Sequence, residues 1–326
     1  MRKLMALWVT LVLLCGIAIV PATAETPAKI SIVTTTFPIY DWVRQITAGE
    51  ENIEITMLMD SGIDLHNYDP TAQDILKIAT CDLFIYVGGE SDDWVEHTLY
   101  HAAHDGLYVI NLMASLGNDV LEEEFVEGME EAEETDDHGD EDGEAESPDY
   151  DEHVWLSLRN AQYFVRIIAD VLSESFPERA ERFQANAESY IAKLHELDKS
   201  YYVMVLKAQR NTLLFGDRFP FLYLVKDYGL NYYAAFKGCS AESEASFETI
   251  IFLAGKVDEL ELPAVLTIEG TKNHLAETIV QNTGSKDQKV LTLDSMQSVT
   301  AARVAEGADY LDIMEANLAV LEEALN

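Results

Sequence analysis

Two of the eight histidines lie where a metal-binding site is expected. His66 occurs in GIDLHNYDP, directly after a strand-like run that ends at Met59 and before a helical pattern that starts near Pro70. His153 occurs in DEHVWLSL, where an acidic stretch rejoins a regularly patterned part of the chain. Neutral imidazole is the commonest side-chain ligand of transition-metal ions. A single loop histidine is not specific by itself, so both are candidates that depend on the elements around them.

Three further histidines follow one helical pattern. His97, His101 and His104 have the spacing i, i+4, i+7, so they share one face of a helix, and this spacing is compatible with metal binding. Acidic residues flank this face and no cysteine accompanies it. We therefore expect a solvated helix surface rather than a ligand set. His195 lies on the polar flank of another helical pattern and is expected to be solvated as well.

Signatures of common enzymes are missing from the sequence. There is no H-E-x-x-H, G-x-S-x-G, P-loop or G-x-G-x-x-G motif. Gly88 and Gly89 follow a strand-like run, but no further glycine has the spacing of a phosphate-binding loop. The sequence thus favours a binding protein over an enzyme.

Strand-like runs and helical patterns alternate in two parts of the chain. In the first part, the strands are expected at Lys29–Thr35, Ile53–Met59, Asp82–Val87 and Leu107–Leu112, and the helices at 38–48, 70–80 and 91–104. In the second, the strands are expected at Thr212–Phe215, Asn231–Phe236, Ala264–Ile268 and Lys289–Leu293, and the helices at 219–228, 244–259, 271–283 and 303–325. Such alternation predicts an α/β fold with two lobes, each a parallel-rich sheet flanked by helices. Because ligands bind outside the carboxyl ends of the strands, we expect a cleft between the lobes.

One long helix is expected to join the lobes. Ser175-Phe176-Pro177-Glu178 resembles a capping box with proline in the first turn. Apolar or aromatic residues then recur every three or four positions, at Phe183, Ala187, Tyr190, Leu194, Leu197, Tyr201 and Met204. A helix from about 177 to 209 would be roughly 50 Å long at 1.5 Å per residue. That length predicts a rigid strut between the two lobes.

The first 24 residues have the pattern of an export signal. Arg2 and Lys3 precede an apolar run, and the segment ends in small residues before Glu25, so we expect cleavage there and an extracytoplasmic protein. Lipid attachment at Cys15 is a weaker alternative because the preceding residue is the bulky Leu14. Cys81 and Cys239 remain in the mature chain, and an oxidising compartment permits but does not require a disulfide between them.

The chain is strongly acidic, with 59 Asp and Glu against 21 Lys and Arg, a net charge of −38. This charge argues against binding to nucleic acids or anionic membrane surfaces and is compatible with cationic ligands. Residues 119–152 contain 19 of the acidic residues and no lysine or arginine. Within them we expect a disordered loop at 127–149 that includes His138. It is interpreted either as a solvated linker or as a weak collector of cations.

The motifs together resemble the zinc- and manganese-binding cluster of substrate-binding proteins of ABC transporters. GIDLHNYDP is similar to the family pattern G-x-x-x-H-x-Y-E-P, and DEHVWLSL to D-P-H-x-W-L-S/D-P. FPFLYLVKDYGL and the later Glu269 segment followed by AETIVQNTG also resemble family segments. The resemblance covers about 29–325. It implies two α/β lobes, one metal ion in the cleft, and an ABC importer permease with its ATPase as partner.

The resemblance also implies the ligands. It assigns His66 and His153 from the amino-terminal lobe and Asp294 from the carboxy-terminal lobe. At the remaining family position this sequence has Arg218, which cannot bind a cation. Asp217, one residue earlier, is therefore the expected ligand, and Glu244 is the reserve candidate.

Imidazole and carboxylate ligands suit both candidate metals, with zinc favoured and manganese next. The predicted function is that of an extracytoplasmic, monomeric receptor that delivers this ion to the importer. A secreted metal-dependent hydrolase and an acidic surface adhesion or calcium-binding protein are the alternatives. The predicted division is a signal peptide at 1–24, an amino-terminal lobe at 25–175, a linking helix at 176–209 and a carboxy-terminal lobe at 210–326.

Overall fold

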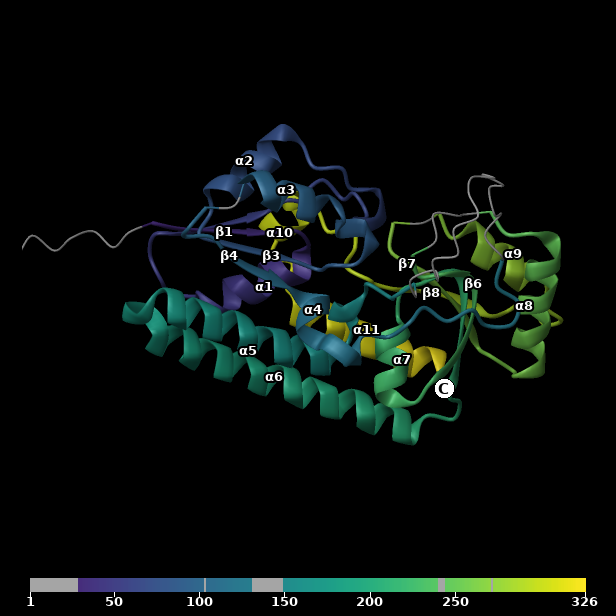
Figure 1. The fold of residues 1–326 in the computed structure, drawn as a ribbon. Helices are drawn as coiled ribbons and strands as arrows, with labels where there is room; N and C mark the ends of the chain where they lie inside the picture. The colour runs from purple at the N-terminus through teal and green to yellow at the C-terminus, as the bar shows by residue number, and fades with distance from the viewer. Residues whose placement is uncertain (1–28, 103, 131–148, 240–243, 271) are drawn as a thin grey trace, which may run out of the picture.

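The computed structural model describes residues 29–102, 104–130, 149–239, 244–270 and 272–326. The expected signal peptide, Cys15 and His138 lie outside these residues. Two lobes stand side by side above a pair of long helices (Figure 1). Among the described residues, no helix combines the length and the apolar character needed to cross a membrane.

The amino-terminal lobe contains a parallel four-stranded sheet in the order β2-β1-β3-β4. Its elements are β1 (Ile30–Thr34), α1 (Phe37–Ile46), β2 (Ile53–Met57), α2 (Ala72–Thr80), β3 (Leu83–Tyr86), α3 (Trp94–Ala102), β4 (Tyr108–Asn111) and α4 (Leu112–Leu116). Ile30 and Ile32 of β1 pack toward α1, whereas Val33 packs on the opposite face with α2 and α3. Helices therefore cover both faces of this sheet, as predicted.

The carboxy-terminal lobe repeats this arrangement in the order β6-β5-β7-β8, again with every strand parallel. Its elements are β5 (Thr212–Phe219), α7 (Leu222–Tyr228), β6 (Asn231–Lys237), α8 (Phe247–Glu259), β7 (Ala264–Ile268), α9 (His274–Asn282), β8 (Lys289–Leu293), α10 (Ala301–Ala305) and α11 (Tyr310–Ala324). Strand β5 is four residues longer than expected and contains a register shift between Phe215 and Arg218. Gly307, with φ +100°, lies between α10 and α11, where one continuous helix was predicted.

The predicted strut is confirmed as a 3₁₀ turn, Pro177–Arg179, followed by α6 (Ala180–Lys207). The seven apolar positions that predicted it are the buried residues of this helix. The capping box was wrong, because Ser175 is the last residue of a preceding helix, α5 (Leu158–Ser175), and its hydroxyl donates to the Val171 carbonyl. Helix α5, which was not predicted, packs along α6 beneath the lobes (Figure 1).

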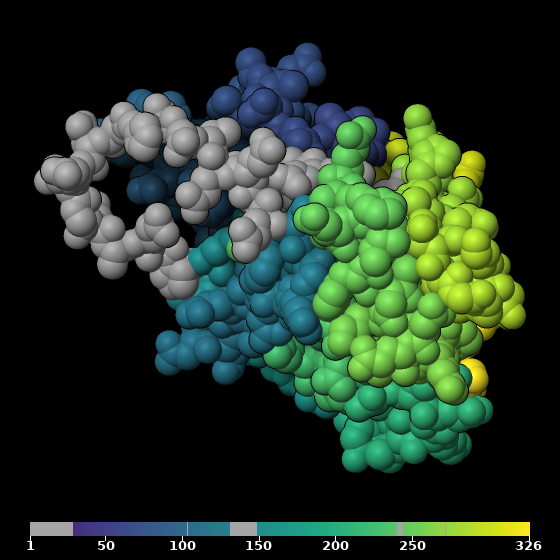
Figure 2. Space-filling view, turned by 90° about the vertical axis from the view of Figure 1, so that its right-hand side faces the viewer, coloured from purple at the N-terminus to yellow at the C-terminus, as the bar shows by residue number. Residues whose placement is uncertain are grey.

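The chain also crosses between the lobes outside this helix. The Glu130 amide donates to the Ala235 carbonyl, and Met129 is buried, so this part of the expected disordered loop is ordered against the carboxy-terminal lobe. In the space-filling view the blue-teal surface before the loop adjoins the green surface of that lobe (Figure 2). Near the other end of the chain, the Ala301 amide donates to the Asp60 carbonyl of the amino-terminal lobe. The lobes are thus joined at several points.

Candidate metal centre

His66 is positioned by a short turn beyond the carboxyl end of β2. The turn is a 3₁₀ helix, Leu65–Asn67, and the Asp64 carboxylate caps it by accepting from the His66 amide at 3.1 Å. This fixes the backbone at His66 and brings the Asp64 carboxylate to the same place. Asp64 Oδ1 lies 4.0 Å from His66 Nε2. The expectation that His66 lies in the loop after the second strand is confirmed.

His153 is positioned by the segment that returns from the acidic stretch. It precedes a 3₁₀ turn, Val154–Leu156, and the hydroxyl of Ser157 then caps α5. Trp155 anchors this segment, because its indole Nε1 donates to the Ser295 carbonyl of the other lobe at 2.9 Å. Gly238 leaves room for the ring, since a Cβ at that residue would lie 3.2 Å from His153 Cε1. His153 is completely buried.

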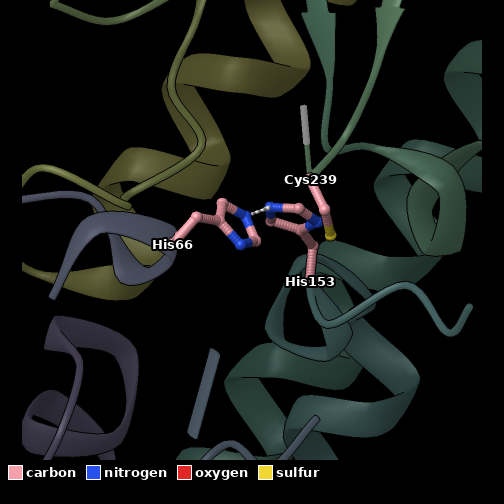
Figure 3. Close-up of side chains that lie close together, drawn as sticks. All are labelled: His66, His153 and Cys239. Atoms are coloured by element: carbon pink, nitrogen blue, oxygen red, sulfur yellow. Dashed lines mark hydrogen bonds between the residues drawn. The ribbon is translucent and has the colours of Figure 1, made fainter. Parts of the chain in front are cut away.

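The two imidazoles face each other at the junction of the lobes. His66 Nε2 and His153 Nε2 are 3.3 Å apart, and the ring planes are inclined at 63° (Figure 3). The side chain of His66 is only 8% exposed, so the pair is closed off from solvent rather than open in a cleft. The structure therefore brings together the two residues that the sequence favoured most.

The other ring nitrogens are held by polar partners. His66 Nδ1 is 2.8 Å from the Ser91 hydroxyl and 3.3 Å from Glu152 Oε2. His153 Nδ1 is 3.1 Å from Asp151 Oδ1. Partners of this kind favour a proton on Nδ1 and direct Nε2 toward a metal ion, which would replace the proton of the hydrogen bond between the two Nε2 atoms. Both rings thus have the orientation that metal-binding histidines require.

Carboxylates set the charge of this region. Burial disfavours the charged form of His153, but the nearby carboxylates of Asp151, Glu152 and Asp64 outweigh it and raise the pKa of His153 above 6.5. For Glu152, burial acts to raise the pKa, but hydrogen bonds from His66 and Ser91 outweigh it and lower that pKa below 4.5. The negative potential that stabilises a protonated imidazole would also stabilise a bound cation.

Cys239 supplies a third side chain that the sequence analysis did not select. Among the described residues, one group of three ligating side chains has donor atoms within 4.8 Å of one another, namely His66, His153 and Cys239 (Figure 3). Cys239 is a free cysteine that follows β6, just as His66 follows β2 in the equivalent sheet. Burial, followed by the charge of Glu123, raises the pKa of the Cys239 thiol. A thiolate there therefore needs a cation beside it.

Gln297, Asp64 and Arg218 form a polar network beside the two imidazoles. The Gln297 amide fits with its nitrogen 2.9 Å from Asp64 Oδ1 and its oxygen 3.2 Å from His153 Nε2. Arg218 Nη2 donates to Asp64 Oδ2 at 2.8 Å. The family position that was expected to bind the ion is thus occupied by a fixed positive charge paired with Asp64.

The predicted carboxylate ligands lie outside the histidine–cysteine group. Asp217 Oδ2 accepts from the Ile268 amide at 3.2 Å, and with Glu244 it lines a separate pocket of about 480 Å³. Asp294 Oδ2 accepts from Arg303 at 2.5 Å, while its Oδ1 accepts from the Met296 amide. The structure does not bring Asp217 or Asp294 to the two imidazoles, and their role as ligands stays a prediction.

The fold and the facing imidazoles define a two-lobed α/β protein with a candidate transition-metal centre at the junction of its lobes. The family model for zinc-uptake complex component A, periplasmic (ZnuA), matches residues 32–324, and the chain belongs to this family. This agrees with the resemblance given by the histidine motifs.

Individual relatives agree with this membership. The chain is 31% identical to the zinc-binding lipoprotein AdcA of Streptococcus pneumoniae over 312 residues, covering 95% of this chain and 59% of that protein. It is 29% identical to the high-affinity zinc uptake system protein ZnuA of Bacillus subtilis, covering 97% and 94%. The Zn(II)-bound ZnuA-like domain of S. pneumoniae AdcA superposes with a TM-score of 0.71 at 27% identity, covering 91% and 99%. The chain spans less than two thirds of the length of the streptococcal AdcA proteins it matches.

Proposed function

We propose that this chain is the extracytoplasmic receptor of a zinc importer of the ABC type and that it binds one zinc ion between its lobes. The observation that carries the proposal is the 3.3 Å separation of His66 Nε2 and His153 Nε2. Two nitrogens that each lie 2.0–2.1 Å from a tetrahedral zinc ion are roughly 3.3–3.4 Å apart. The pair therefore has the spacing of one edge of a zinc coordination tetrahedron.

Two further donors within reach complete the proposed ligand set. Cys239 lies in the same group as the imidazoles, and Asp64 Oδ1 lies 4.0 Å from His66 Nε2. A thiolate with two imidazoles favours zinc over manganese, which prefers oxygen ligands. Asp217 and Asp294 would have to leave their present hydrogen bonds to bind the same ion. Zinc-binding names among the relatives support the same choice.

A transport role follows from the closed surroundings of the pair. A buried ion held by protein ligands leaves no open coordination position for an activated water, which catalytic zinc sites keep. The proposed receptor therefore passes its ion to a membrane permease driven by an ATPase, and it is proposed not to be an enzyme. The export signal expected at 1–24 is consistent with an extracytoplasmic location.

The experiment is a zinc and manganese titration of the purified chain by calorimetry, with elemental analysis of protein prepared without chelator. We expect one tightly bound zinc ion per chain and its loss in the His66→Ala/His153→Ala variant. His195→Ala is the matched control, because His195 is an exposed histidine on α6. Tight zinc binding that survives the double substitution would refute the assigned centre. Cys239→Ser and Asp64→Asn then separate the two proposed additional donors from Asp217→Asn and Asp294→Asn.

A further inference from the structure

A second pair of histidines lies on the outer surface of the amino-terminal lobe. His97 and His101 are both exposed on α3, and their ring centroids are 4.9 Å apart with the planes inclined at 66°. His104, which shares their spacing in the sequence, has a different role. Its ring nitrogens lie 3.1 Å from the Cys81 carbonyl oxygen and 3.2 Å from the Gly106 amide that donates to it. The three histidines are therefore divided into one whose ring is held by backbone hydrogen bonds and a pair whose rings lie against each other.

The sequence led us to expect a solvated surface here rather than a ligand set, but the adjacent rings of His97 and His101 have the geometry of a chelating site. Residues at i and i+4 lie one turn apart on the same face of a helix. The 4.9 Å between the ring centroids is short enough for one nitrogen of each ring to reach a shared ion at 2.0–2.1 Å. The rings are already adjacent and α3 is an ordered helix, so binding requires little additional ordering. Two imidazoles on a helix, with water in the other positions, suit zinc, copper or nickel.

The charge around the start of α3 favours a cation. Asp93 is exposed and precedes His97 by four residues, and Glu96 adjoins it in sequence. Asp93, Glu96 and Glu90 also line a pocket of about 370 Å³ beside the beginning of the helix. These acids do not form the site, but they raise the local concentration of cations beside the two imidazoles.

We propose that His97 and His101 form a second binding site for a divalent transition-metal ion, separate from the buried centre at His66 and His153. The two sites share no residue. The surface site has two protein ligands and is solvated, so it binds more weakly and exchanges its ion faster than the buried centre. It goes beyond the proposed transport function, and it stands or falls independently of the buried centre.

The test uses the full chain, without an affinity tag, loaded first with one equivalent of zinc. Further zinc is then added while calorimetry records binding and nuclear magnetic resonance records the imidazole signals of ¹⁵N-labelled histidines. We expect a second, weaker binding event that shifts the signals of His97 and His101 together. His97→Gln and His101→Gln should each weaken this second binding event by at least about tenfold. Removing a residue that only supports a metal ligand already lowers metal affinity by about tenfold or more, and removing the ligand itself should lower it at least as much.

The controls separate this site from other weak binding. His195→Gln removes an exposed histidine that has no helical histidine partner and should leave the second event unchanged. The first zinc equivalent should keep its affinity in His97→Gln and His101→Gln, and their melting temperatures should match that of the parent because both side chains are exposed. A second event that is unaffected by either substitution, or imidazole signals that do not move up to millimolar zinc, would overturn the proposal.

Discussion

Replacing Arg218 by glutamine should make the protein bind zinc more tightly. Arg218 Nη2 lies 2.8 Å from Asp64 Oδ2, and both side chains are less than one fifth exposed. The guanidinium therefore places a permanent positive charge beside a carboxylate that would otherwise attract a zinc ion. Arg218→Gln removes that charge but keeps an amide that can donate to Asp64.

The size of the effect follows from the distances. His66 Nε2 is 4.0 Å from Asp64 Oδ1, so an ion bound to this nitrogen would lie roughly 6–8 Å from the guanidinium, given metal–nitrogen bonds of about 2 Å. Repulsion between charges of +2 and +1 at this distance is on the order of 1–5 kcal/mol for effective dielectric constants between about 80 and 20. We therefore expect the dissociation constant for zinc to fall at least about fivefold.

The assay is competition for zinc against a chromophoric chelator at fixed pH and ionic strength. Arg218→Lys, which keeps the charge, is the matched control and should bind zinc about as the parent does. The melting temperature of the zinc-free Arg218→Gln protein shows whether the lobes remain assembled. If Arg218→Gln is folded and binds zinc no more tightly than Arg218→Lys, the electrostatic argument is wrong.

Three other predictions follow from the same region. Burial raises the pKa of Asp92 from 3.8 to about 7. Ionisation of this carboxyl therefore costs the folded state on the order of 4 kcal/mol above pH 7. Asp92→Asn should increase the free energy of unfolding at pH 8 and leave it unchanged near pH 3.5. Because nearby carboxylates outweigh burial and raise the pKa of His153 above 6.5, zinc affinity should begin to fall at a higher pH than an unperturbed histidine would give. Asp151→Asn should move that onset to lower pH in the same chelator assay. Gly89 has φ +85° and ψ −173°, and a Cβ there would lie 2.3 Å from Glu152 Oε1. Gly89→Ala should therefore lower the melting temperature, through strain of about 1–3 kcal/mol, and weaken zinc binding. Gly255→Ala is the control, because a Cβ at Gly255 meets nothing within 4 Å, and it should not weaken zinc binding.

The parts of the centre that depend on local sequence were predictable. His66 follows a strand that alternation with helices identified, and loops after parallel strands meet at one edge of the sheet. The apolar repeat of α6 was equally readable, because every third or fourth residue packs on one side of a helix. These features are encoded within 10 to 30 consecutive residues, roughly the size of one supersecondary unit.

The parts that depend on pairing between distant segments were not predictable. Cys239 was considered only as a disulfide partner for Cys81. Both are free thiols, and Cys239, which follows the edge strand β6, lies beside the imidazoles. Asp217 was expected at the start of a helix, but β5 continues through it to Phe219, and the Asp217 carboxylate accepts from the Ile268 amide.

Helix α5, by contrast, could have been predicted. Its apolar residues, including Phe164, Ile168 and Leu172, recur at helical spacing.

The contact between the beginning and the end of the chain has a consequence for how the protein folds. The buried carboxylate of Asp41 accepts from the Tyr310 amide at 3.1 Å, and Gln45 donates to Asp309 at 2.8 Å. A growing chain therefore cannot finish its first lobe until residues more than 260 positions later have been synthesised. Contacts of such long sequence separation slow folding and couple distant segments. We expect unfolding to be a single cooperative transition of both lobes, and the newly made amino-terminal half to require protection until its carboxy-terminal partner arrives.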